Sequence, residues 1–183
     1  MSKIKRLIKS YSDFISIPWR SDAAAAERVI FCVYNEGEEL RLRARIDEFE
    51  IATHQSGHGW AVFDLTDTFA NWLSCQRYAK SYFQKPELLS TLLPRYLAYI
   101  TEDFEKFLQE NSVSEGSVVA LVGVGSLFGF LKVKELVDKF APLVKGRLLI
   151  FFPGSYEKNN YRLLDGYDGW NYLAVPITAD RES

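Results

Sequence analysis

Three short segments of the chain are almost continuously apolar, and this feature limits the fold more than any other. They are VIFCVY at 29–34, SVVALVGV at 117–124 and RLLIFF at 147–152. Each is rich in β-branched or aromatic residues, and none alternates apolar with polar residues as a strand with one solvated face does. They are typical of strands covered on both faces. WAVFDL at 60–65 and NYLAVPI at 171–177 complete a predicted set of five strands.

Helical periodicity separates these strands. Asn35 begins a helix, with Glu38 at the capping-box position, and a long helix is predicted after Pro94. Strands joined through helices imply parallel neighbours and right-handed crossovers. The sequence therefore predicts one α/β domain over 1–183. It has three layers, with a mostly parallel five-stranded sheet and helices on both faces, in a Rossmann-like or P-loop-like arrangement without a Walker A motif.

The N-terminal segment 1–17 predicts an amphipathic helix. Its apolar face includes Ile4 and Leu7, and its outer face carries basic residues, namely Lys3, Lys5, Arg6 and Lys9. Such a face is either the solvated side of a packed helix or a docking surface for nucleic acid or a protein. The whole chain has a formal net charge of -2, so direct nucleic-acid binding is not expected.

The length of the apolar runs and the two cysteines both bear on where in the cell the protein is expected. No apolar run approaches the roughly 18 residues needed to span a bilayer, so no membrane contact is expected. Cys32 and Cys75 both lie in apolar surroundings and are predicted to be buried thiols, not disulfide partners. These features favour a cytoplasmic location.

The glycine turn at 123–129 resembles the turns that hold phosphate groups. A dinucleotide-binding turn needs G-x-G-x-x-G and an acidic residue about 20 positions later. Here Gly123, Gly125 and Gly129 are one residue too widely spaced, and the next strand ends in Phe152 instead of an acid. A tight turn is one interpretation, and a bound nucleotide is the other.

If a ligand binds there, the candidate ligand-binding residues are Gly123, Gly125, Ser126 and Asp64. Asp64 ends a predicted strand, where a carboxylate can hold Mg²⁺; alternatively, it accepts hydrogen bonds from loop amides while Thr66 or Asp67 caps the next helix. Arg41, Arg43 and Arg45 suggest phosphate binding. However, Arg43 lies four residues before Asp47 and Arg45 three residues before Glu48, so local ion pairs on a helix can account for them.

The motifs of catalysis and of metal binding are missing. Ser126 lacks the G-x-S-x-G context of a nucleophile, and His54 and His58 lack the adjacent glutamate of H-E-x-x-H. The sequence predicts no catalytic residue, no metal and no cofactor, and an enzyme is not expected.

The segment 153–170, PGSYEKNNYRLLDGYDGW, predicts a long loop, and long loops are often functional. Aromatic residues beside an arginine are typical of protein interfaces. The candidate partner-binding residues are Tyr156, Asn159, Asn160, Tyr161, Arg162, Tyr167 and Trp170. The alternative is that the loop folds back onto the edge of the domain.

Four segments carry a resemblance to a known family. They are ERVIFCVYNEGEELRLRARIDEFEIAT, HGWAVFDLTDTFANWL, VVALVGVGSLFGF and RLLIFFPGSYEKNNYRLLDGYDGWNYLAVPI. Together they cover nearly the whole chain, and the sequence resembles the BrxB family, a small component of bacteriophage exclusion (BREX) defence systems.

The resemblance implies a role in bacterial systems that methylate host DNA at adenine and block phage replication. The family occurs with a methyltransferase, a large ATPase and PglZ, a protein of the alkaline-phosphatase superfamily, and no established enzymatic activity comes with it. We therefore expect a non-catalytic assembly or adaptor subunit, with PglZ as its direct partner and a homodimer as a further possibility. The alternative is a module that senses a nucleotide or another anion at the ends of the strands.

Overall fold

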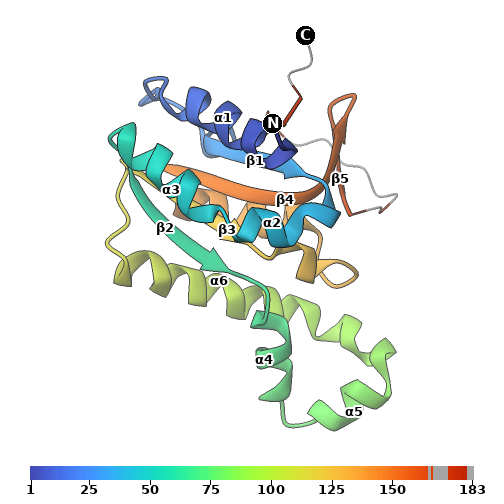
Figure 1. Ribbon diagram of the computed structural model, residues 1–183. Helices are drawn as coiled ribbons and strands as arrows, with labels where there is room; N and C mark the ends of the chain where they lie inside the picture. Colours follow the sequence, from blue (N-terminus) through green and yellow to red (C-terminus); the bar gives the residue numbers. More distant parts are fainter. Residues whose placement is uncertain (165, 167–172, 181–183) are drawn as a thin grey trace.

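The computed structural model describes residues 1–164, 166 and 173–180 (Figure 1). Its central sheet has the strand order β2-β3-β4-β1-β6, and every neighbouring pair on this path is parallel. The strands are β1 (Val29–Tyr34), β2 (Gly59–Asp64), β3 (Ser117–Val122), β4 (Arg147–Glu157) and β6 (Val175–Ile177). The parallel order agrees with the predicted crossovers.

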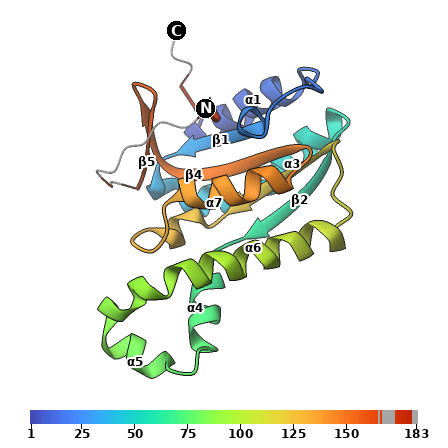
Figure 2. The same ribbon diagram turned by 180° about the vertical axis from the view of Figure 1, so that it is seen from behind.

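Helices cover both faces of the sheet, so the predicted three-layer α/β fold is confirmed (Figures 1 and 2). The helices are α1 (Lys3–Ile15), α2 (Glu39–Arg43), α3 (Ile46–Gln55), α4 (Thr68–Ser74), α5 (Ala79–Gln84), α6 (Leu93–Glu110) and α7 (Val133–Phe140). The core on one face includes residues of α1, α2 and α3, and the core on the other includes residues of α4, α6 and α7.

The continuously apolar strands are explained by this layering. Along β1, Phe31 belongs to the core beneath α6 and α7, whereas its neighbour Cys32 belongs to the core beneath α1 and α3. Successive side chains of a strand point to opposite faces, so a central strand covered twice needs apolar residues at every position. All six residues of β1 and all six of β3 are buried.

The start of the predicted loop at 153–170 is instead a hairpin. β4 continues to Glu157 and turns through Lys158 and Asn159 into the antiparallel strand β5 (Asn160–Leu163). Both turn residues have positive φ, 49° and 64°, as a tight hairpin turn requires, and asparagine tolerates this conformation. The prediction of an irregular loop was wrong here because the four alternating residues of β5 are too few to separate a strand from a loop. Over the described residues, the sheet therefore has six strands instead of the predicted five.

Two further predictions need correction. Cys32 is buried as expected, but Cys75 is exposed, because it lies just after the last residue of α4 and not on its packed face. The strand predicted at 171–177 corresponds to β6, which begins only at Val175. Residues 171 and 172 lie outside the described part of the chain.

Between β2 and β3 the chain extends beyond the sheet. α4, α5 and the 3₁₀ turn Pro86–Thr91 form this extension, which returns to the domain through α6 (Figures 1 and 2). Among the described helices, none is both long and apolar enough to cross a bilayer.

Candidate functional site

The four predicted ligand residues meet at one edge of the sheet. Asp64 is the last residue of β2 and pairs with Val122 at the end of β3, and Gly123 follows directly. Gly123, Gly125 and Ser126 line a pocket of about 310 Å³ there. Asp64 lies beside it, because its carboxylate contacts Thr66 of the same lining. We call this region, with Tyr34, Glu39 and Arg43, the carboxyl edge.

The charged side chains of the carboxyl edge bind one another. Asp64 Oδ1 accepts hydrogen bonds from the Thr66 backbone N–H at 2.9 Å and from Thr66 Oγ1 at 2.6 Å. Arg43 donates from Nη1 to Asp64 Oδ2 at 3.3 Å, from Nη2 to Thr66 Oγ1 at 2.6 Å and from Nε to Glu39 Oε1 at 2.7 Å. The Tyr34 hydroxyl donates to the other Glu39 oxygen. This network joins the ends of β1 and β2 through α2.

These contacts favour the charged forms of Asp64 and Arg43. Partial burial raises the pKa of the Asp64 carboxyl, but the hydrogen bonds from Thr66 and the charge of Arg43 outweigh it, so the net pKa is lowered. Partial burial lowers the pKa of the Arg43 guanidinium, and Glu39 and Asp64 more than reverse that effect. Burial and the bond to Glu39 raise the pKa of Tyr34, which therefore stays a neutral donor.

Of the two ion pairs predicted for Arg43 and Arg45, the structure contains one. Arg45 contacts Glu48 at 3.1 Å, as its spacing predicted. Arg43 contacts Glu39 and Asp64 instead of Asp47. Sequence spacing identifies partners on one helix, but it cannot show that the end of β2 lies within reach of α2.

The glycine turn is closed by its own hydrogen bonds. Gly123 has φ of 80°, and a Cβ atom there would lie 2.4 Å from Thr66 Oγ1, so only glycine fits. Ser126 Oγ donates to the carbonyls of Gly123 at 2.7 Å and Leu65 at 3.1 Å. The Ser126 N–H donates to Gly123 and the Phe128 N–H to Gly125. A phosphate-binding loop instead directs such amides at its ligand.

The charges around this pocket do not favour an anion. Its described lining contains Glu36 and Glu39, with Asp64 alongside, against one arginine, Arg43. That arginine already contacts two of the carboxylates. An incoming phosphate would meet an excess of negative charge and would have to compete for Arg43.

The two histidines have contacts of their own. The His58 ring stacks on Trp19 with centroids 3.6 Å apart, and the Arg147 guanidinium lies 4.6 Å from the Trp19 ring centroid. His54 Nδ1 lies 3.0 Å from the His58 carbonyl oxygen. This geometry joins the N-terminal segment to the sheet and brings neither histidine to Ser126.

Five of the seven predicted partner residues lie on the hairpin, and not all of these five are at the surface. Asn159, Asn160 and Arg162 are exposed and Tyr156 is half-buried, but Tyr161 is fully buried. The Tyr161 hydroxyl donates to the Ala174 carbonyl at 2.8 Å, and its ring packs against Phe31. Tyr161 therefore fastens the hairpin to the domain. Tyr167 and Trp170 lie outside the described residues.

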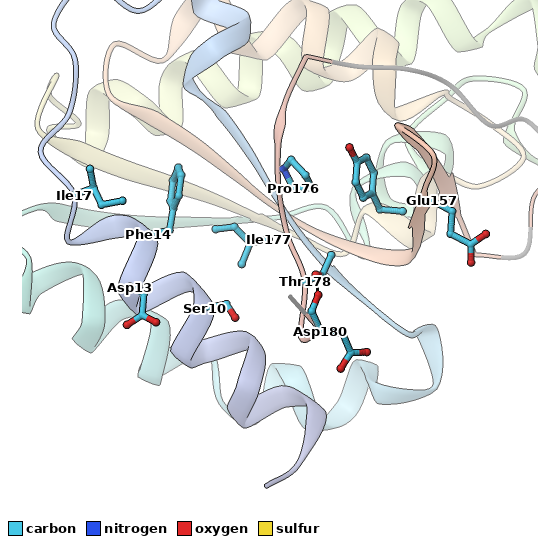
Figure 3. A pocket seen from close by; sticks show the side chains of 10 residues that line it. Ser10, Asp13, Phe14, Ile17, Glu157, Pro176, Ile177, Thr178 and Asp180 are labelled. Atoms are coloured by element: carbon cyan, nitrogen blue, oxygen red, sulfur yellow. Dashed lines mark hydrogen bonds between the residues drawn. The ribbon is translucent and has the colours of Figure 1, made fainter. Parts of the chain in front are cut away.

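A larger cavity, which was not among the predicted sites, lies between the hairpin, α1 and β6 (Figure 3). We call it the α1–β6 groove, and its volume is about 760 Å³. Its lining residues are Ser10, Asp13, Phe14, Ile17, Tyr156, Glu157, Pro176, Ile177, Thr178 and Asp180. These come from segments more than 130 positions apart in sequence, so the groove exists only in the folded chain.

One signal in the sequence pointed toward the groove. Phe14 adds an apolar residue on a second side of α1, next to the buried stripe that includes Tyr11 and Ile15, and the exposed Ile17 follows just after the helix ends. A helix packed along a single stripe needs no such second side.

Comparison with known proteins identifies the family. A family model described as "BREX protein BrxB" matches residues 63–176, which include β3, β4, α6, α7 and the hairpin. Comparisons with curated proteins and with solved structures found no match. The match covers more than half of the 183 residues and both sides of the glycine turn. The chain therefore belongs to the BrxB family of BREX proteins.

Proposed function

We propose that the chain is a non-catalytic assembly subunit that binds a larger BREX component, PglZ, and so supports host DNA methylation and phage restriction. Membership of the BrxB family makes it a component of a BREX system. PglZ is the partner that the family resemblance implies. The proposal places the chain in the bacterial cytoplasm, where host DNA is methylated.

The observation that supports this proposal most is the hairpin. It leaves Asn159, Asn160 and Arg162 exposed, and Tyr156 and Glu157 form one wall of the α1–β6 groove. The Tyr161 ring and hydroxyl fix the hairpin to the domain, so the hairpin backbone is already ordered before a partner binds. Rigid elements beside an apolar groove are typical of surfaces that bind proteins.

The direct test is co-purification of the tagged full chain with PglZ. We expect a stoichiometric complex on size-exclusion chromatography, and separate elution of the two proteins would overturn the proposal. Arg162→Ala should weaken the complex by about ten-fold if the hairpin lies in the interface, because arginine is frequent among the residues that contribute most to binding. Lys106→Ala, on the exposed side of α6, is the matched control and should leave binding unchanged.

A ligand at the carboxyl edge is the second candidate function. The observation in its favour is the pocket of about 310 Å³ that Gly123, Gly125 and Ser126 line. Thermal unfolding with ATP or GTP and Mg²⁺ tests it, because a ligand at 100 times its dissociation constant adds about 2.7 kcal/mol. An unchanged melting temperature would reject this candidate, and a shift that Asp64→Asn abolishes would support it.

A further inference from the structure

We infer that the α1–β6 groove is the docking site for a basic segment of the partner protein that inserts an apolar anchor residue. This inference rests on the proposed function, because it names the surface and the chemistry of that same contact. It uses the described side chains of α1, β6 and the hairpin.

The floor of the groove is apolar and partly exposed to solvent. Phe14 lies in the last turn of α1 and Ile17 just after that helix ends, and Pro176 and Ile177 of β6 lie opposite them (Figure 3). Ile17 is 60% exposed. Burying apolar surface gains roughly 25 cal/mol per Å², so a partner that covers this floor gains free energy on binding. An aliphatic or aromatic anchor suits that surface.

The rim of the groove is acidic. Asp13, Glu157 and Asp180 come from α1, the hairpin and the segment after β6. Arg6 contacts Asp180 at 3.3 Å from outside the groove, and the exposed fractions of the two side chains are 44% and 74%. Within the part of the chain that the structure describes, the lining contains three carboxylates and no basic residue. Complementarity of charge therefore selects a basic segment and disfavours an acidic one.

The segment is held by its side chains and not by strand addition. Among the described strands, β6 pairs only with β1, which leaves its other edge open. However, Pro176 is the middle residue of β6 and has no N–H group to offer a new strand. Proline on an edge strand discourages further pairing. The occupant is thus a helix or loop that places an apolar side chain on the floor and basic side chains at the rim.

The experiment compares two groove variants with two matched controls. Ile17→Arg blocks the floor, and the double variant Glu157→Lys with Asp180→Lys reverses the rim. Ile51→Arg on α3 controls the first, since Ile51 is 52% exposed and does not line the groove. Glu105→Lys controls the second, since Glu105 is exposed on α6, which covers the opposite face of the sheet.

Binding of each variant to purified PglZ is measured by isothermal titration calorimetry, and circular dichroism confirms that each is folded. Each groove variant should raise the dissociation constant about ten-fold or more, which is at least about 1.4 kcal/mol, while the controls change it less than about two-fold. Raising NaCl from about 50 to about 500 mM should weaken binding of the unchanged protein more than that of the double variant.

The outcomes separate the inference from the proposed function. If the unchanged chain does not bind PglZ, the proposed function fails, and the inference fails with it. If binding is intact and the groove variants bind as well as the controls, the docking inference alone fails. Tighter binding by the double variant would mean an acidic occupant and would overturn the inference. So would self-association in sedimentation velocity that Ile17→Arg abolishes, because the occupant would then be a second copy.

Discussion

The carboxyl edge and the α1–β6 groove both combine carboxylates with a hollow surface, but they use their polar groups differently. At the carboxyl edge, Arg43 contacts Glu39 and Asp64, and Ser126 donates to two carbonyls. In the groove, Asp13, Glu157 and Asp180 surround an apolar floor, no basic residue belongs to its described lining, and Arg6 contacts Asp180 from outside. Carboxylates that share a cation hold a fold together, whereas carboxylates placed around exposed apolar surface suit a partner.

Gly123→Ala should be the most damaging change at the carboxyl edge. The new Cβ atom would meet Thr66 Oγ1 at 2.4 Å and the Thr66 backbone N at 2.7 Å, in a left-handed conformation. We expect a loss of about 3 kcal/mol or more in the free energy of unfolding, measured by urea denaturation.

Gly129→Ala is the matched control for this prediction. Gly129 has φ of 82°, and nothing lies within 4 Å of its added Cβ. It should cost only the conformational strain, about 1 kcal/mol. Equal losses for both variants would show that Gly123 does not fit closely against Thr66.

Arg43→Met should come next, because it leaves Glu39 and Asp64 without their shared cation. The side chain of Arg43 is 30% exposed, so we expect a loss of about 1–2 kcal/mol instead of the larger cost of a fully buried pair. Arg41→Met is the control, since Arg41 is 73% exposed and contacts only Glu38 among the described ion pairs. Denaturation measures stability, and PglZ binding should not change. Weaker binding in Arg43→Met would show that the two regions are coupled.

Tyr161→Phe tests how firmly the hairpin wall of the groove is fixed. It removes the hydroxyl that donates to Ala174 and leaves that carbonyl with one bond fewer, at a cost of about 1 kcal/mol. The ring contacts with Phe31 remain. Thermal unfolding measures the loss, and Tyr156→Phe, whose hydroxyl donates only to exposed Asn159, is the control. Identical melting temperatures for Tyr161→Phe and the unchanged protein would contradict the proposed anchor.

The smallest expected effect is a pH dependence at the carboxyl edge. The pKa of Asp64 is below its usual 3.8 in the folded chain, so the unfolded chain binds more protons near that pH. The stabilisation is present above pH 3.8 and is lost as pH falls through the lower, folded pKa. Asp64→Asn should therefore show a shallower fall in stability below about pH 4, measured by acid unfolding. If stability falls equally steeply below pH 4 in Asp64→Asn and in the unchanged protein, Arg43 and Thr66 do not stabilise the carboxylate.

Much of the carboxyl edge was predictable, because it is assembled from strand ends. Parallel strands end at the same edge of a sheet, so Asp64 and Gly123 had to lie near one another once β2 and β3 were recognised. The pairing of Arg43 was not predictable, because it depends on how α2 packs over that edge.

The hairpin, in contrast, could not be predicted from the sequence. Its turn residues, Lys158 and Asn159, fit a two-residue turn, but four alternating residues are too few to separate a strand from a loop. Tyr161 is polar enough to suggest a surface contact. Its burial becomes visible only when Ala174 provides an acceptor and Phe31 a packing partner.

The sequence by itself determined the strands of the parallel path and the layered architecture, because hydrophobic periodicity is a local property of the chain. The tertiary structure alone decided that Asp13, Glu157 and Asp180 share one groove and that Arg43 joins Glu39 to Asp64. The physical reason is that electrostatic and apolar contacts act through space, and only the strand order β2-β3-β4-β1-β6 and the packing of α1 and α2 bring these side chains together.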